Sequence, residues 1–247
     1  MSDALTMTGR CLRLTGRQLD ALLTSLLLPV MLMLMFVYLF GGAIHTGTRY
    51  VTYVVPGVLM VCAGFGAATT AVNVTQDMTG GVIDRFRSMD VRGTAFLTGH
   101  VVASAARNLV STVLVFSVAY LIGFRPQASV GGWLAAAGIL LAFVLAISWL
   151  AAAFGLLVKT VEAANSFTFI MAFVPYASAA FVPVATMPWW IQGFARDQPI
   201  TPVVDSLRAL LLGMPAGSAP WTALIWCGGL LAGAAAASSV LFRRRTA

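Results

Sequence analysis

Charged residues are scarce in this sequence, since Asp, Glu, Lys and Arg together make up 9% of its 247 residues and only eight are acidic. A soluble domain carries about 25% charged residues, so this scarcity excludes an ordinary soluble fold. Cysteine is almost absent too, and the three that occur lack the paired spacing of a disulfide framework or a zinc site. Apolar residues make up 60% of the chain and give a mean hydropathy of +0.91, which predicts an integral membrane protein.

Long apolar runs are the main feature of the sequence. A helix needs about 20 apolar residues to cross the ~30 Å hydrocarbon layer of a bilayer, and the chain has room for six such helices. No small-residue cleavage site follows the first run, so we interpret it as a retained span rather than a signal peptide. We therefore expect an all-α integral membrane protein with a single transmembrane domain over residues 1–247. The six expected transmembrane helices cover residues 22–41, 51–74, 99–123, 131–157, 166–184 and 220–242.

Basic residues are unevenly divided between the two sides of these spans. If the N-terminus is inside, the inner segments hold ten Lys or Arg residues and the outer segments hold four. Lys and Arg are enriched in cytoplasmic loops, so both termini and the loop 75–98 are predicted to be cytoplasmic. The net charge of +7 is then a topology signal, and we expect no nucleic-acid partner.

The N-terminal segment, residues 3–20, has a helical period with arginines on one side and leucines on the other. This pattern is typical of an amphipathic helix that lies in the membrane interface. Two roles stay open for it, a membrane-surface anchor or a direct part in docking a partner. The residues of the two faces are Arg10, Arg13 and Arg17, and Leu5, Leu12 and Leu19.

A second unusual segment, residues 187–213, is too polar to span and too apolar for a free loop. Three prolines divide it into two short helices, near residues 188–196 and 201–212. Asp205 and Arg208 are three residues apart and are predicted to pair on one helix face. We expect two outer re-entrant helices that dip into the outer leaflet and return, between spans five and six.

Catalytic motifs are missing from the sequence. The nearest approach to a phosphate-binding loop is GLLVKT at residues 155–160, but Val158 stands where that loop needs glycine. His45 and His100 fall on opposite sides of the membrane in this topology, and no carboxylate pair accompanies a nucleophile and a base. We expect no enzyme activity, no metal site and no cofactor in this chain, so any ATP must be hydrolysed by another one.

Arg107 is the one full charge expected inside a span. A long side chain at that depth reaches water by extending to the inner interface, which is the first interpretation. The alternatives are that Arg107 lines a polar cavity or pairs with Asp77 or Glu162 near the inner ends of the spans.

The stretch DMTGGVIDRFRSMDVRG, residues 77–93, holds six of the 23 charged residues of the chain. Gly80 and Gly81 break the incoming helix, and a short helix with an apolar face follows, formed by Val82, Phe86 and Met89. So short a helix is marginal alone and needs a surface to pack on. Residue patterns leave two surfaces open, the membrane face with the inner loops of the chain, or a cleft on a soluble partner.

Two stretches resemble known proteins. DMTGGVIDRFRSMDVRGTAFLTGHVV resembles the cytoplasmic coupling segment of type-2 ABC exporter permeases, in particular the daunorubicin/doxorubicin-resistance group. SAAFVPVATMPWWIQGFARDQPITPVVDSLRALLLG is similar to the signature of that family between spans five and six. One departure is Asp90, which stands where the family usually has proline, and the change alters how the coupling helix ends.

The resemblance implies a six-helix permease in the bacterial cell membrane, with an N-terminal interfacial helix, a coupling helix over residues 77–93 and outer re-entrant helices. It implies two permeases, identical or paralogous, and two separate ATP-binding subunits that hold ATP and Mg. By the same resemblance, Gly81, Asp84, Arg85, Phe86 and Arg87 lie in the helix that contacts the ATP-binding subunit. We expect Arg92 to belong to the same coupling site, and Lys159 and Glu162 to lie in the second cytoplasmic loop.

The expected function is ATP-driven export of a hydrophobic or amphipathic drug, secondary metabolite or lipid, with multidrug or antibiotic resistance as the outcome. Phe169, Phe173 and Tyr176 share one helix face and either contact this substrate or are ordinary lipid-facing or core aromatics. The alternatives are an ATP-independent secondary transporter or channel, a structural membrane subunit, and a membrane enzyme. The sequence does not identify the substrate.

Overall fold

The computed structural model describes residues 8–9, 19–44, 47–80 and 93–246 of the chain. Helices form all the regular structure in these residues, and no strand occurs among them. The described elements are α2 (Leu19–Met35), η1 (Phe36–Phe40), α3 (Tyr50–Thr79), α5 (Gly93–Leu121), α6 (Val130–Leu157), α7 (Val161–Phe173), η2 (Val174–Ala177), η3 (Val184–Thr186), α8 (Trp189–Asp197), α9 (Ile200–Leu212) and α10 (Ala219–Thr246).

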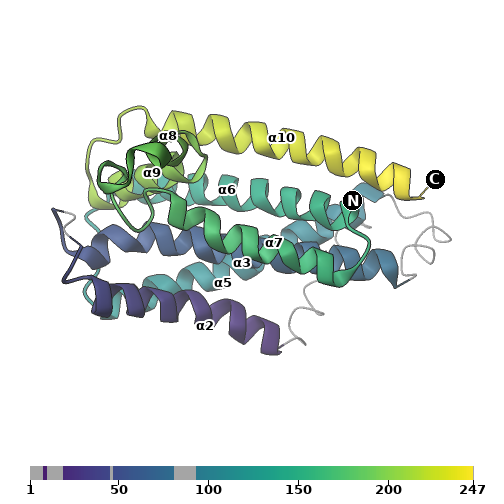
Figure 1. Cartoon of the computed structure of the whole chain (residues 1–247), viewed down its shortest axis with the longest axis horizontal. Coiled ribbons are helices and arrows are strands. Elements are labelled where there is room, and N and C mark those ends of the chain that lie inside the picture. The colour runs from purple at the N-terminus through teal and green to yellow at the C-terminus, as the bar shows by residue number, and fades with distance from the viewer. Residues whose placement is uncertain (1–7, 10–18, 45–46, 81–92, 247) are drawn as a thin grey trace.

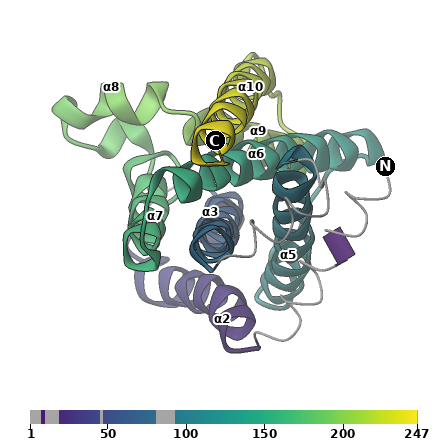
Figure 2. The same cartoon turned by 90° about the vertical axis from the view of Figure 1, so that its right-hand side faces the viewer.

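The long helices lie side by side along one axis, with α3 at the centre (Figures 1 and 2). Helices α2, α5, α6 and α7 all pack against α3, while α10 packs on the outer side of α6. Burial follows this order, since 89% of the apolar window of α3 is buried and only 17% of that of α10. Helices α8 and α9 gather at one end of the bundle, which we call the cap end; the C-terminus of α10 marks the opposite, C-terminal end (Figure 1).

Four of the described helices have the length and apolar composition to cross a membrane. They are Tyr50–Thr79, Ala95–Leu121, Val130–Leu157 and Ala219–Arg245, and they coincide with the predicted second, third, fourth and sixth spans. The all-helical membrane class is therefore confirmed. Helices α2 and α7 lie where the first and fifth spans were predicted, and a total of six spans stays a prediction.

Local chemistry explains where several helices begin and end. The Ser129 hydroxyl accepts a hydrogen bond from the Gly132 N–H at 3.1 Å and starts α6, and the Thr160 hydroxyl accepts one from the Ala163 N–H at 3.2 Å and starts α7. Helix α9 ends at Gly213, whose φ of 66° lies in the left-handed region that favours glycine.

Close helix packing in the bundle depends on glycine at one contact in particular. A Cβ atom on Gly155 of α6 would lie 2.5 Å from the Ala71 carbonyl oxygen of α3, so only glycine fits there without a backbone shift. The Thr75 hydroxyl donates to the Gly155 carbonyl at 2.9 Å at the same place. Helices α3 and α6 are therefore joined by both packing and a buried hydrogen bond.

The structure corrects three predicted boundaries. Asp77 belongs to the last turn of α3, which runs on to Thr79, and the remainder of the predicted coupling helix up to residue 92 lies outside the described residues. Helix α5 already begins at Gly93. Regular helix in the predicted fifth span, 166–184, ends at Phe173 because Pro175 has no N–H to donate, and a 3₁₀ turn follows. The predicted N-terminal helix, residues 3–20, lies mostly outside the described residues, and α2 starts at Leu19.

Candidate functional site

The predicted coupling residues fall in a part of the chain that the structure does not describe. Gly81, Asp84, Arg85, Phe86, Arg87 and Arg92 all lie within residues 81–92, and their roles stay predictions. The two helices that flank this segment are described, since α3 ends at Thr79 and α5 begins at Gly93. Both of these helix ends lie at the C-terminal end of the bundle (Figure 1).

A buried pair joins these two helices just inside the segment. The His100 imidazole Nε2 of α5 lies 3.1 Å from the Asp77 carboxylate of α3, and the two side chains are 5% and 14% exposed. The Phe96 ring packs edge-on against the imidazole, with 4.7 Å between the ring centroids. The pair therefore fixes the end of α3 to the start of α5.

Lys159 and Glu162, predicted for the second cytoplasmic loop, lie at the same end of the bundle. Lys159 is in the short connection between α6 and α7, Glu162 is in the first turn of α7, and both are exposed. The Arg245 guanidinium of α10 donates a hydrogen bond to the neighbouring Val158 carbonyl. The connection between α6 and α7 is thus attached to the last turn of α10.

Arg107 is folded into the bundle and is 7% exposed, so it does not extend to the interface as the first interpretation expected. Its Nη2 donates to the Thr70 hydroxyl at 2.8 Å and to the Gly66 carbonyl at 3.3 Å, both on α3. Gly66 also lets the neighbouring Asn108 side chain of α5 approach α3, because a Cβ atom on Gly66 would lie 2.4 Å from the Asn108 amide nitrogen. Arg107 therefore ties α5 to the central helix at mid-bundle.

Serines extend these contacts to a third helix. The Ser104 hydroxyl of α5 donates to the Gly66 carbonyl at 3.3 Å, and the Ser148 hydroxyl of α6 donates to Ser104 at 2.8 Å. Both serines are fully buried. We name the polar side chains and the carbonyl that join the three helices the polar seam: Gly66, Thr70, Asp77, His100, Ser104, Arg107 and Ser148.

Sequence reasoning missed the polar seam, although a signal for it was present. The α5 residues His100, Ser104, Arg107 and Ser111 follow at spacings of four, three and four, which places them on one helix face, and all four are buried. A polar stripe inside a membrane span predicts an interface with another helix.

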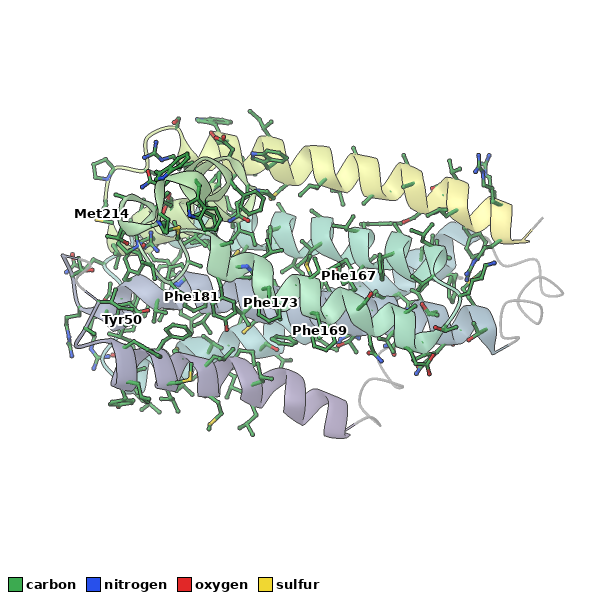
Figure 3. All side chains as sticks on the ribbon, viewed as in Figure 1. Tyr50, Phe167, Phe169, Phe173, Phe181 and Met214 are labelled. Carbon is green, nitrogen blue, oxygen red and sulfur yellow. The ribbon has the colours of Figure 1, made fainter. Side chains whose placement is uncertain are left out.

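The three aromatic residues predicted for a substrate path differ in their surroundings. Phe169 and Phe173 are 67% and 68% exposed and lie one turn apart along α7 (Figure 3). Tyr176 instead stacks on Phe181, with 4.8 Å between the ring centroids, and lies 6.1 Å from the Phe36 ring of η1. The exposed pair forms an outward-facing aromatic surface, whereas Tyr176 belongs to the packing of the cap end.

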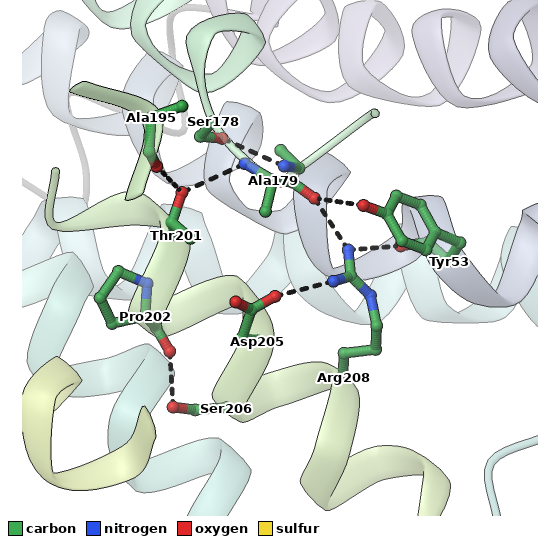
Figure 4. Close-up of polar contacts among 10 residues, drawn as sticks. Tyr53, Ser178, Ala179, Ala195, Thr201, Pro202, Asp205, Ser206 and Arg208 are labelled. Atoms are coloured by element: carbon green, nitrogen blue, oxygen red, sulfur yellow. Dashed lines mark hydrogen bonds and ion pairs between the residues drawn. The ribbon is translucent and has the colours of Figure 1, made fainter. Parts of the chain in front are cut away.

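Arg208 is the centre of a polar cluster at the cap end (Figure 4). Its guanidinium donates to the Asp205 carboxylate at 2.8 Å, to the Ala179 carbonyl at 2.9 Å and to the Tyr53 carbonyl at 3.3 Å. It also lies over the Tyr53 ring, 3.7 Å from the centroid, and the Tyr53 hydroxyl donates to the Ala179 carbonyl at 3.0 Å. The predicted pairing of Asp205 with Arg208 is confirmed, and the further partners come from α3 and the segment after η2.

Burial and pairing have opposite effects on the Asp205 carboxyl group in this cluster. Burial raises the pKa of the Asp205 carboxyl above its usual value, and the neighbouring Arg208 guanidinium opposes that rise. The Asp205 side chain is still 44% exposed, whereas the Arg208 side chain is 12% exposed. Arg208 is therefore the more deeply held member of the pair.

The segment after η2 is held from the other side as well. The Thr201 hydroxyl at the start of α9 accepts from the Ala179 N–H at 3.1 Å and donates to the Ala195 carbonyl of α8 at 2.5 Å (Figure 4). The Tyr50 hydroxyl of α3 donates to the Phe181 carbonyl at 3.0 Å. Helices α3, α8 and α9 thus close around residues 177–181 at the cap end.

Comparison with known proteins decides the family of this helical bundle. The family model described as ABC-2 type transporter matches residues 3–212. The chain belongs to the ABC-2 type transporter family. The match includes the predicted coupling segment, residues 77–93, and helices α8 and α9, and it stops before α10.

Two relatives of this ABC-2 chain have descriptive names. The chain is 29% identical over 194 residues to the daunorubicin resistance ABC transporter permease protein DrrB1 of Streptomyces coeruleorubidus. This alignment covers 78% of this chain and 69% of that protein. It is 22% identical over 246 residues to the probable doxorubicin resistance ABC transporter permease protein DrrC of Mycobacterium tuberculosis, covering 99% of this chain and 89% of that protein.

Residues that could bind a metal ion are spread apart in the described part of the ABC-2 bundle. Within the described ranges, no three His, Cys, Asp or Glu residues lie close enough together to hold a metal ion. The two described cysteines, Cys62 and Cys227, are buried and free.

Proposed function

We propose that this chain is the permease subunit of an ATP-driven ABC exporter and forms the path for a hydrophobic or amphipathic substrate. The observation that carries the proposal is the ABC-2 family match over residues 3–212, in a bundle with four helices suited to cross a membrane. Both relatives are named as permease proteins for drug resistance, one for daunorubicin and one for doxorubicin. A drug or a drug-like secondary metabolite is therefore the first substrate class to test, with a lipid as the next.

The proposed architecture has six spans. Helix α2 with η1 runs over residues 19–40, and α7 with η2 over residues 161–177. At 1.5 Å per residue these lengths are about 33 Å and 26 Å, against a hydrocarbon thickness of ~30 Å. We assign them as the first and fifth spans, with α8 and α9 as the outer re-entrant helices and residues 3–20 as the interfacial helix.

We place the C-terminal end of the bundle in the cytoplasm of a bacterial cell and the cap end outside. Arg243, Arg244 and Arg245 end α10, and Lys159 lies at the same end. Basic residues favour the cytoplasmic side of a bilayer, which supports this orientation.

Coupling to a separate ATP-binding subunit is assigned to the segment around Phe86 and Arg87. That subunit would bind ATP and Mg, and this chain would supply the path without hydrolysing ATP. The Asp77–His100 pair joins the helices on both sides of the segment, so a displacement of the segment would move α3 and α5 together. Lys159 and Glu162 would form a second contact to the same partner.

The translocation path is assigned to the interface between two permease copies, identical or paralogous. The outward-facing Phe169 and Phe173 on α7 would line it, because aromatic faces suit an amphipathic substrate. Arg107 is assigned a role in holding α5 on α3 rather than in contacting substrate, since its guanidinium is occupied within the bundle. ATP binding would favour the outward-open state through contacts that differ between the two states.

Two variants test the coupling assignment. Phe86→Ala and Arg87→Glu are expected to lower both co-purification with the ATP-binding subunit and transport-coupled ATP hydrolysis. The exposed Arg196→Glu on α8, at the opposite end of the bundle, is the matched charge-reversal control and should leave both at the wild-type level. If Phe86→Ala and Arg87→Glu behave like this control while the protein is folded, the docking assignment is wrong.

The alternatives make different predictions in purified form. An ATP-independent transporter or channel would move substrate in liposomes without the ATP-binding subunit. A structural membrane subunit would bind that partner but leave transport uncoupled from ATP hydrolysis. A membrane enzyme would turn over a substrate chemically and would lose that turnover when a His or Asp residue is replaced.

A further inference from the structure

A cavity of about 180 Å³ lies between four helices in the cap-end half of the bundle. Almost all of its lining surface is apolar, so it offers a water molecule too few hydrogen-bond partners to hold it. An apolar cavity of about 150 Å³ in a soluble protein stays dry and accepts a molecule the size of benzene, so this larger one accepts a short stretch of hydrocarbon. The lining residues are Leu59 of α3, Thr112 and Phe116 of α5, Trp133, Ala136, Ala137 and Leu140 of α6, and Leu207 and Leu211 of α9.

The cavity reaches from the central helix to the outer surface of the bundle. Leu59 and Leu207 are 1% exposed and form its floor, whereas Trp133 and Ala137 of α6 are exposed and form its rim. Small side chains on α6 leave the space, since Ala136 and Ala137 stand between the larger Trp133 and Leu140. The opening thus lies on the side of the bundle where α5 and α6 meet the surroundings.

Depth along the bundle matches one leaflet of a bilayer. Trp133 lies in the first turn of α6, and Leu140 lies about 10 Å further along the helix at 1.5 Å per residue. Half of a ~30 Å hydrocarbon core is about 15 Å, so the cavity spans the part of one leaflet that is nearer the headgroups. Tryptophan at the rim suits the level where acyl chains meet headgroups.

Two arginines stand at the headgroup end of the cavity. The Phe116 ring of the wall packs on Phe124, with 6.1 Å between the centroids, and Arg125 follows directly. The exposed Arg125 donates to the Phe124 carbonyl at 3.0 Å and lies over the Tyr120 ring at 4.1 Å from the centroid. The exposed Arg49 lies against the same turn, because a Cβ atom on Gly123 would be 3.0 Å from its Nη2. Two positive charges at this level complement a phosphate group.

We propose that the cavity binds one acyl chain of a phospholipid whose phosphate lies at Arg125 and Arg49. An empty cavity would forfeit dispersion contacts along its walls, and the bilayer supplies hydrocarbon chains at this depth in excess. The bound lipid would fill the space between α3, α5, α6 and α9 and so support the cap end. The proposal needs only that the bundle lies in a membrane, and it is independent of the exported substrate and of the ATP-binding subunit.

Lipid retention in native mass spectrometry tests the proposal on the full chain. The protein is reconstituted in phosphatidylglycerol and phosphatidylethanolamine, extracted in mild detergent and washed, and the phospholipid that stays bound is counted. Wild-type protein is expected to keep one phospholipid under washes that strip Ala137→Phe, in which a ring fills the rim. Ala135→Phe is the control, because Ala135 is exposed on the same helix and does not line the cavity. Arg125→Gln should release the lipid more readily than wild-type protein does.

Thermal melting of each variant shows that the fold is kept before lipid is counted. Equal retention in wild-type, Ala137→Phe and Ala135→Phe protein overturns the proposal. A change of oligomeric state in Ala137→Phe without loss of lipid would assign the cavity to a second copy of the chain and overturns it as well. Loss in Ala137→Phe with full retention in Arg125→Gln overturns the assignment of the phosphate.

Discussion

Replacing Arg208 by alanine is expected to loosen the cap end of the bundle. The substitution removes the guanidinium hydrogen bonds to the Asp205 carboxylate at 2.8 Å and to the Ala179 carbonyl at 2.9 Å. It also removes a longer hydrogen bond to the Tyr53 carbonyl and the contact with the Tyr53 ring. A hydrogen bond from a charged donor contributes about 1.5–3 kcal/mol, and a cation–π contact about 0.5–2 kcal/mol. The pair with the 44% exposed Asp205 contributes at most about 1 kcal/mol. We expect Arg208→Ala to lower the free energy of unfolding by about 3 kcal/mol.

The assay is reversible unfolding in mixed micelles, followed by hydrogen exchange of the cap segment. Amides of residues 177–181 should exchange faster in Arg208→Ala, because the Ala179 carbonyl loses one of its two side-chain donors. Arg208→Lys keeps the positive charge but loses the planar guanidinium, so its stability and exchange rates should lie between those of wild type and Arg208→Ala. Arg196→Ala, an exposed arginine on α8, is the control and should change stability by less than about 0.5 kcal/mol. If Arg208→Ala is as stable as Arg196→Ala, Arg208 does not hold the cap.

Three further substitutions test the α3–α6 contact at Gly155, the Ser104–Ser148 hydrogen bond and the burial of Asp205. Gly155→Ala forces a Cβ atom to 2.5 Å from the Ala71 carbonyl and should cost about 1–3 kcal/mol, while Gly138→Ala meets nothing within 4 Å and should be neutral or slightly stabilising in thermal unfolding. Ser148→Ala removes a buried 2.8 Å hydrogen bond and should lower the free energy of unfolding by about 1 kcal/mol. An unfolding curve identical to that of wild type would contradict this prediction. Burial raises the pKa of Asp205 in the folded protein above its usual value of about 3.9, so this contribution to stability is present below pH ~3.9 and is lost as the pH rises through the folded-state pKa. The stability of wild type relative to Asp205→Asn should therefore fall as the pH rises above about 4, and a difference that does not change with pH would contradict this.

The membrane spans could be predicted from the sequence wherever local apolar composition alone identifies a span. An apolar run of span length is visible without knowledge of any neighbour, and the four helices suited to cross a membrane coincide with predicted runs. The pairing of Asp205 with Arg208 was predictable for a similar reason, because a spacing of three residues determines a common face within one helix.

Contacts between helices were harder to predict. The pairing of Asp77 with His100 depends on the register of two antiparallel helices, which no spacing along one helix determines. The inward direction of Arg107 depends on two acceptors of α3, the Gly66 carbonyl and the Thr70 hydroxyl. The partners of Arg208 beyond Asp205 are backbone carbonyls of distant segments, and a sequence does not reveal where carbonyls converge.

ATP-dependent export by the assembled transporter is the central claim and has a direct measurement. The permease and its ATP-binding subunit are reconstituted together in liposomes with the nucleotide sites facing outward, and uptake of doxorubicin into the vesicles is followed by fluorescence. Uptake should require both proteins and hydrolysable ATP, and vesicles with the permease alone should show none. Equal uptake by the permease alone, with or without ATP, would contradict the account.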